Sequence, residues 1–136
     1  MTFILDTNVV SEVRFGDRMD ARVRAWLENV PDHECHLSAI TVFELAHGVA
    51  RIERLDSAQG RRLREWFERQ IVAYEARILP IDLPVARETA RLHVPDPRPE
   101  RDAFIAATAI VHGMTVVTRS VADFSPLGVP VVNPWE

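Results

Sequence analysis

The chain has 136 residues, of which 47% are hydrophobic and 26% charged, and its net charge at pH 7 is −4. This is the composition of an ordinary globular protein, and the length predicts one domain over residues 1–136 with a core of its own. The acidic balance argues against nucleic-acid binding through a broad basic surface, but it leaves room for a nucleic acid held by a metal ion and a local arginine patch.

Residue types that are missing exclude several kinds of chemistry. All sixteen basic residues are arginine, so P-loop nucleotide binding and Schiff-base catalysis, which need lysine, are excluded. Cys35 is the only cysteine, which excludes an internal disulfide and a cysteine-based zinc site. No apolar run approaches the ~18 residues of a membrane span. The N-terminus lacks a basic segment followed by an apolar one, so we expect no signal peptide, no membrane partner and a cytoplasmic protein.

Apolar runs alternate with helical patterns along the chain. Phe3 to Leu5 form a short apolar run that predicts a strand buried on both faces. Further strands are expected at residues 34–38, 77–81, 115–118 and 130–132, the last at an edge because it contains a proline. Helices are expected at residues 9–15, 18–30, 41–55, 57–74, 82–92 and 102–112, with Ser57 and Asp82 as caps and Gly113 as a stop. This alternation predicts an α/β fold of three layers, α/β/α, around a five-stranded, mostly parallel sheet.

The first strand ends at an acid, Asp6, and a polar turn of Thr7 and Asn8 follows. In open α/β sheets, ligands bind at the carboxyl ends of the strands. A carboxylate at that position is partly desolvated unless a cation, a hydrogen-bond donor or a proton compensates it. The simpler alternative is that one of these three residues only caps the next helix.

Three further acids follow expected strands or begin the next helix. Glu44 is expected in the first turn after the second strand, Asp102 begins an alanine-rich helix, and Asp123 follows the fourth strand. Each has a structural alternative: Thr41 and Glu44 fit a capping box, Asp102 suits the helix dipole, and Asp123 suits the cap of a turn. The separate alternatives do not explain why all the acids are expected at one edge. Carboxylates that gather there raise one another's pKa, and a divalent cation such as Mg²⁺ relieves the repulsion and activates water toward a phosphodiester.

Four segments carry a resemblance to a known family, namely LDTNVVSE, ELAHG, DAFIAATA and VTRSVADF, which begin at residues 5, 44, 102 and 117. In order and spacing they resemble the motifs of PIN-domain proteins, most closely those of the VapC and FitB type of toxin ribonuclease. The resemblance implies a PIN-like fold and an endoribonuclease that depends on Mg²⁺ or Mn²⁺. It also implies a homodimer, and a heteromeric complex with a small antitoxin whose tail enters the acidic groove. By motif position, the metal-site acids are Asp6, Glu44, Asp102 and Asp123.

The last motif departs from the family pattern, because Ser120 stands where asparagine is common. Serine still forms hydrogen bonds, but it reaches less far and lacks the amide donor, so the positioning of Asp123 is open. Thr118 in the same motif is expected to bond an acid or a bound water, and Thr7 and Asn8 are expected to support the site. Candidates for contacts with RNA phosphates are Arg98, Arg101 and Arg119.

Two other functions compete with the nuclease. An aspartyl phosphotransferase would use Asp6 as the nucleophile, but Asn8 stands where such enzymes have a second acid, and no lysine is present to neutralise the phosphoenzyme. A catalytically weak PIN-like module would bind RNA or a partner without cutting, and Ser120 is the feature that favours it. The helical pair that includes Arg51 to Arg69 is a further hypothesis, either an interaction surface or an ordinary core contact.

Overall fold

The computed structural model describes residues 1–136 and contains one five-stranded parallel sheet. Its strand order is β3-β2-β1-β4-β5, and every neighbouring pair is parallel. The strands are β1 (Phe3–Leu5), β2 (Cys35–Ser38), β3 (Ile78–Leu79), β4 (Thr115–Val117) and β5 (Val131–Val132). Each expected strand is present, and β5 lies at an edge as its flanking proline predicted.

Seven α-helices connect and cover the strands. They are α1 (Thr7–Val13), α2 (Ala21–Asn29), α3 (Ala39–Leu55), α4 (Ser57–Tyr74), α5 (Leu83–Leu92), α6 (Glu100–His112) and α7 (Val121–Phe124). The expected cap at Asp82 is confirmed, since its carboxylate accepts from Val85 N at 3.2 Å. Gly113 ends α6 in the left-handed conformation that glycine adopts at little cost.

The predicted cap of α4 was wrong, and so were the predicted starts of α1, α2, α3 and α6, each by two or three residues. Helix α3 begins at Ala39 and not at Thr41, because the Ser38 hydroxyl at the end of β2 accepts from Ile40 N at 3.1 Å. Helix α4 is capped by Asp56 and not by Ser57, and the Asp56 carboxylate accepts from Gln59 N at 3.1 Å. In both cases an earlier residue supplies a hydrogen-bond acceptor of the same quality. Helix α3 therefore begins sooner than predicted, whereas α4 begins at Ser57, as predicted.

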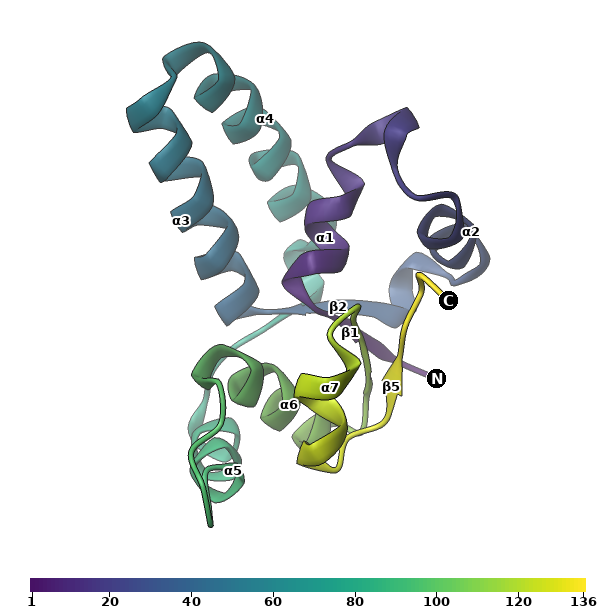
Figure 1. The fold of residues 1–136 in the computed structure, drawn as a ribbon, viewed down its shortest axis with the longest axis vertical. Helices are drawn as coiled ribbons and strands as arrows, with labels where there is room; N and C mark the ends of the chain where they lie inside the picture. Colours follow the sequence, from purple (N-terminus) through teal and green to yellow (C-terminus); the bar gives the residue numbers. More distant parts are fainter.

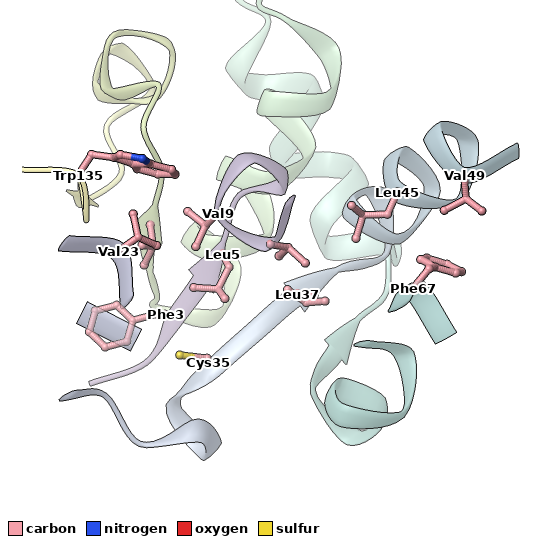
Figure 2. Packing of buried hydrophobic residues seen from close by; sticks show 12 residues of the cluster. Phe3, Leu5, Val9, Val23, Cys35, Leu37, Leu45, Val49, Phe67 and Trp135 are labelled. Atoms are coloured by element: carbon pink, nitrogen blue, oxygen red, sulfur yellow. The ribbon is translucent and has the colours of Figure 1, made fainter. Parts of the chain in front are cut away.

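The helices form two layers, one on each face of the sheet (Figure 1). Helices α1 to α4 contribute to one buried cluster with the β1 residues Phe3 and Leu5, and α5 to α7 contribute to another with Ile4. Figure 2 shows the first cluster, in which side chains of β1 and β2 gather with those of α1, α3 and α4. The expected α/β/α layering is therefore confirmed, and β1 is buried on both faces.

Helices α3 and α4 form a hairpin that extends away from the sheet (Figure 1). Asp56 alone connects them, and the two helices pack closely where Gly60 meets Glu53. Arg64 donates two hydrogen bonds to the Glu53 carboxylate, at 2.8 and 3.1 Å. Phe67 is buried in the first cluster, so part of this hairpin is an ordinary core contact. None of the helices combines the length and the apolar character needed to cross a membrane.

The strand order fixes where a ligand site is expected. The chain goes from β1 to β2 and β3 on one side, and then returns to β4 on the other side of β1. The order therefore reverses between β1 and β4, and ligands of open α/β sheets bind beyond the carboxyl ends of the strands at such a point. Asp6 follows β1 there, and Thr118 follows β4.

Candidate functional site

Asp6 is held at the end of the central strand by hydrogen bonds to its backbone and to both carboxylate oxygens. Its N–H donates to Val117 O at 2.9 Å and so extends the pairing of β1 with β4. One carboxylate oxygen accepts from Thr7 N at 2.8 Å, and the other accepts from the Thr118 hydroxyl at 2.7 Å. The residue is only 6% exposed. Asp6 therefore does cap α1, but the second hydrogen bond fixes the carboxylate in a way that a cap does not require.

Burial raises the pKa of Asp6 above its usual value, and this is the largest influence on the group. The hydrogen bonds from Thr118 and Thr7 lower the pKa, while the nearby carboxylates of Glu44 and Asp123 raise it. The two donors therefore compensate the buried charge only in part. Acids from α3 and α7 both lie near enough to act on Asp6, as the spacing of the motifs predicted.

Glu44 reaches the same site from the second turn of α3, and not from the first turn as the sequence predicted. Because Ser38 caps α3, Thr41 is buried within the first turn and the capping box with Glu44 is not formed. One carboxylate oxygen of Glu44 accepts from the Thr7 hydroxyl at 2.8 Å, and the other lies 3.5 Å from Arg101 Nη1. The alternative in which Glu44 only caps a helix is therefore wrong.

Asp102 enters the site from the first turn of α6, whose start the proline-rich loop places at this edge. Burial raises the pKa of Asp102 to about 6, and the charges of Asp6, Asp123 and Glu44 add to the effect. The side chain forms no ion pair that would lower it. A cavity of about 440 Å³ brings Asp102 together with Asp6, Glu44 and residues of α1; its lining is Asp6, Thr7, Asn8, Ser11, Glu12, Phe15, Glu44 and Asp102.

Asp123 lies at the margin of the acidic cluster. It is an exposed residue of α7 and does not line the cavity, yet its charge contributes to the raised pKa of both Asp6 and Asp102. Its backbone N–H donates to Ser120 O at 3.0 Å, and the Ser120 hydroxyl does not cap the helix. The structure thus brings three predicted acids around one cavity and places the fourth beside them.

Asn8 connects the start of α1 to the segment after β4. Its side-chain amide lies 3.4 Å from the Thr118 hydroxyl and 3.3 Å from the Ser120 hydroxyl, and its oxygen accepts from Arg119 N at 3.4 Å. Ser120 N in turn donates to Thr118 Oγ1 at 2.9 Å. The serine that departs from the family pattern therefore takes part in the network that holds Thr118, the donor to Asp6.

The donor set suits a hard divalent cation. All four acids offer carboxylate oxygens, and burial, together with the neighbouring carboxylates, raises the pKa of both Asp6 and Asp102. No group of three or more His, Cys, Asp or Glu side chains is close enough to bind one ion jointly. This arrangement fits Mg²⁺, which takes one or two carboxylates directly and keeps several waters.

The three arginines expected to contact phosphates have different surroundings. Arg98 is half-buried, its backbone N–H donates to His93 Nδ1 at 2.9 Å, and its buried Nε has no partner. The guanidinium of Arg101 pairs with the Glu44 carboxylate. The guanidinium of Arg119 lies over the ring of Trp135, 5.3 Å from the centroid. Only Arg101 touches one of the acids directly.

Two residues that help to build the site were not among the predicted ones. Glu12 lines the cavity, and its carboxylate accepts from Asp20 N at 2.9 Å, which ties α1 to the start of α2. The buried hydroxyl of Thr41 lies 3.3 Å from the Thr7 hydroxyl. The spacing of Glu12 one helical turn after Asn8 was a usable signal, whereas the contact of Thr41 depends on how α3 packs against α1.

The comparison with known proteins agrees with this geometry. The sequence profile of the PIN domain matches residues 3–120, and the chain belongs to the PIN-domain family. Within that family the chain is similar to toxins and ribonucleases of the FitB and VapC type, which confirms the resemblance that its motifs indicated.

The individual relatives match along almost their whole length. Toxin FitB of Neisseria gonorrhoeae is 40% identical over 139 residues, which cover 97% of each chain. The VapC ribonuclease Y4jK of Sinorhizobium fredii is 36% identical over 142 residues, covering 98% of this chain and 97% of the relative. The crystal structure of FitAcB from Neisseria gonorrhoeae superposes with a TM-score of 0.90 at 38% identity, covering 99% of both chains. The PIN-like fold is therefore confirmed.

Proposed function

We propose that residues 1–136 form one PIN domain that acts as a metal-dependent endoribonuclease and as the toxin of a type II toxin–antitoxin module. The observation that carries the proposal is the convergence of Asp6, Glu44 and Asp102 on one cavity, with Asp123 close enough to raise the pKa of two of them. Such a cluster weakens a fold unless a cation neutralises it, so its presence favours a metal site over separate helix caps. The kinship with toxins and ribonucleases supports RNA as the substrate.

Mg²⁺ or Mn²⁺ is the cofactor that this set of oxygen ligands fits. Of the four acids Asp6, Glu44, Asp102 and Asp123, one or two would hold the ion directly and the others through its bound waters. When bound, the ion supplies a polarised water and stabilises the charge that develops on the phosphate during hydrolysis. The acids also attract the ion into a groove that would otherwise repel a polyanion. The protein's negative charge is thus compatible with RNA cleavage.

Residues around the acids fix their positions. Thr118 and the Thr7 backbone hold the two oxygens of Asp6, while the Thr7 hydroxyl holds Glu44. Asn8 secures the segment that carries Thr118. A carboxylate that is oriented before the ion arrives loses little freedom on binding it, which is why such supporting contacts raise metal affinity. Arg98, Arg101 and Arg119 are the proposed phosphate contacts, and Arg101 stands nearest to the acids.

A groove on α1, α3 and α4 supports a protein partner. It comprises two adjoining cavities of about 300 and about 440 Å³ that share Arg14, Ile52, Leu63 and Trp66, and it extends from Glu44 to Arg69. The indole N–H of Trp66 is buried there without a partner. The cavity that lacks Glu44 is lined by no acid and by four arginines, namely Arg14, Arg18, Arg62 and Arg69. We propose that an antitoxin segment with apolar and acidic side chains binds here, that the toxin is a homodimer, and that the complex is cytoplasmic.

The decisive experiment compares the purified protein with Asp6→Asn on defined single-stranded and looped RNAs, with Mg²⁺, with Mn²⁺ and with a chelator. Asparagine is as good a helix cap as aspartate, so this variant keeps the start of α1 while removing the charge. We expect internal cleavage by the wild type only with metal, at least about 100-fold less by the variant, and inhibition by the cognate antitoxin. Asp96→Asn, at an exposed loop residue, is the matched control.

The outcomes separate the competing functions. Full activity of Asp6→Asn would exclude this site as the nuclease centre. Binding of RNA without cleavage under every metal condition would favour the catalytically weak module. Circular dichroism of both variants verifies that the fold is retained, because a loss of activity is informative only for a folded protein.

A further inference from the structure

Phe43 is an exposed aromatic residue at the rim of the acidic site. It lies on α3 directly before Glu44 and is 51% exposed. It packs with neither of the two buried clusters. The hydrophobic effect does not favour a half-exposed phenylalanine, and a single one needs no explanation on a protein surface. Phe43, however, lies beside the proposed RNA site. Its neighbours suit it to bind a planar group.

The Phe43 ring belongs to a stack of planar groups. The His47 ring lies one helical turn further along α3, with the centroids 6.1 Å apart and the planes within 22°. The Arg101 guanidinium carbon lies 5.0 Å from the Phe43 centroid. Because Arg101 also lies 3.5 Å from the Glu44 carboxylate and precedes Asp102 in the chain, the stack is tied to the acids from two helices.

An exposed ring beside a guanidinium is a recurring way to bind unpaired nucleotides. Every base has a flat face that stacks on an aromatic side chain, and an arginine next to the ring contacts the neighbouring phosphate. The need for such a contact is greater here than in a basic protein, because a chain with a net charge of −4 has little general attraction for RNA. Stacking supplies affinity that does not depend on charge.

We propose that Phe43, together with His47 and Arg101, forms a stacking subsite for the unpaired base next to the scissile phosphodiester. In this arrangement the base extends the existing stack, and the Arg101 guanidinium leaves Glu44 to contact the adjacent phosphate. The subsite deepens the proposed ribonuclease function and rests on it. It predicts a preference for single-stranded or looped RNA, because a base inside a duplex is already stacked on both of its faces.

The test measures RNA binding in the Asp6→Asn background, where the substrate stays intact. Fluorescence anisotropy with a short labelled single-stranded RNA compares Phe43→Ala, Phe43→Trp and the control Val72→Ala, which removes an apolar side chain that is 72% exposed on α4. Loss of one base–aromatic stack weakens binding by about 5- to 150-fold, so we expect a loss in that range for Phe43→Ala. Phe43→Trp retains the affinity, and Val72→Ala does not change it.

A second arm uses RNA with one abasic nucleotide at the cleaved position. The losses from the missing base and from Phe43→Ala should not add, because each removes the same contact. In the active protein, Phe43→Ala should raise KM more than it lowers kcat.

Equal RNA affinity of Phe43→Ala and the parent would overturn the subsite. So would a change in molecular mass by light scattering that accounts for the loss, because Phe43 would then be a contact between protein chains. If the wild type cleaves RNA and Phe43→Ala binds normally, only the subsite fails. If the wild type neither binds nor cleaves RNA, the proposed function fails, and the subsite with it.

Discussion

Asp102→Asn should stabilise the metal-free protein at neutral pH while it abolishes RNA cleavage. Burial and the neighbouring acids raise the pKa of Asp102 from 3.8 to about 6, so the folded state disfavours the ionised form. The stability linked to this group is complete below the unfolded value of 3.8 and is lost as pH rises toward about 6. At about 1.4 kcal/mol for each pH unit the upper bound is about 3 kcal/mol. Because the side chain is partly exposed, screening by water reduces the expected gain to about 1 kcal/mol.

Urea unfolding in the presence of a chelator measures this effect. At about pH 7.5 the variant should unfold at a higher urea concentration than the wild type, and the difference should shrink as the pH approaches about 4. Added Mg²⁺ should stabilise the wild type more than the variant, because the ion binds the folded state through the carboxylates. Asp96→Asn should behave as the wild type at both pH values. A variant less stable at about pH 7.5, or an equal change at both pH values, would refute the reasoning.

The remaining predictions concern the contacts that support the site. Thr7→Val removes the hydroxyl bonded to Glu44 and should lower the metal affinity measured by calorimetry about 10- to 100-fold. Thr7→Ser keeps the hydroxyl and should keep the affinity. Unchanged affinity of Thr7→Val would contradict the supporting role of this contact. Gly60→Ala places a Cβ 2.5 Å from the Glu53 Cα, so α3 and α4 must separate at a cost of about 1–3 kcal/mol in thermal unfolding. Gly48→Ala meets no atom within 4 Å and should instead stabilise α3 by about 0.5–1 kcal/mol.

The sequence predicted the fold well because its signals are local. Three apolar residues before Asp6 suffice to indicate a strand buried on both faces, and the alternation with helices implies the parallel sheet. The start of α3 and the cap of α4 were harder to predict, because Ser38 and Thr41, like Asp56 and Ser57, are caps of similar strength only a few residues apart. Which of them is used depends on where the preceding element ends, and that is decided by packing.

The site could be predicted as a set of acids but not as an arrangement. The motifs identify Asp6, Glu44 and Asp102, and a parallel sheet brings such residues to one edge. The partner of Glu44 is the Thr7 hydroxyl on another helix, 37 residues away in the chain. Nor does any local pattern place Arg101 over Phe43. Contacts of this kind depend on the angle at which the helices pack, and that angle cannot be predicted from the pattern of a single sequence.

The environment of Asp6 explains why hydrogen bonds alone do not complete this site. Both carboxylate oxygens already have donors, from Thr7 and Thr118, and still the pKa of Asp6 stays above its usual value. Two donors from a rigid framework orient the group but leave its negative charge uncompensated, and Glu44 adds a like charge close by. A fold that needed only a helix cap would not bring a second and a third carboxylate to a buried aspartate. The site therefore keeps several carboxylate oxygens and an excess of negative charge, and such a site suits a divalent cation.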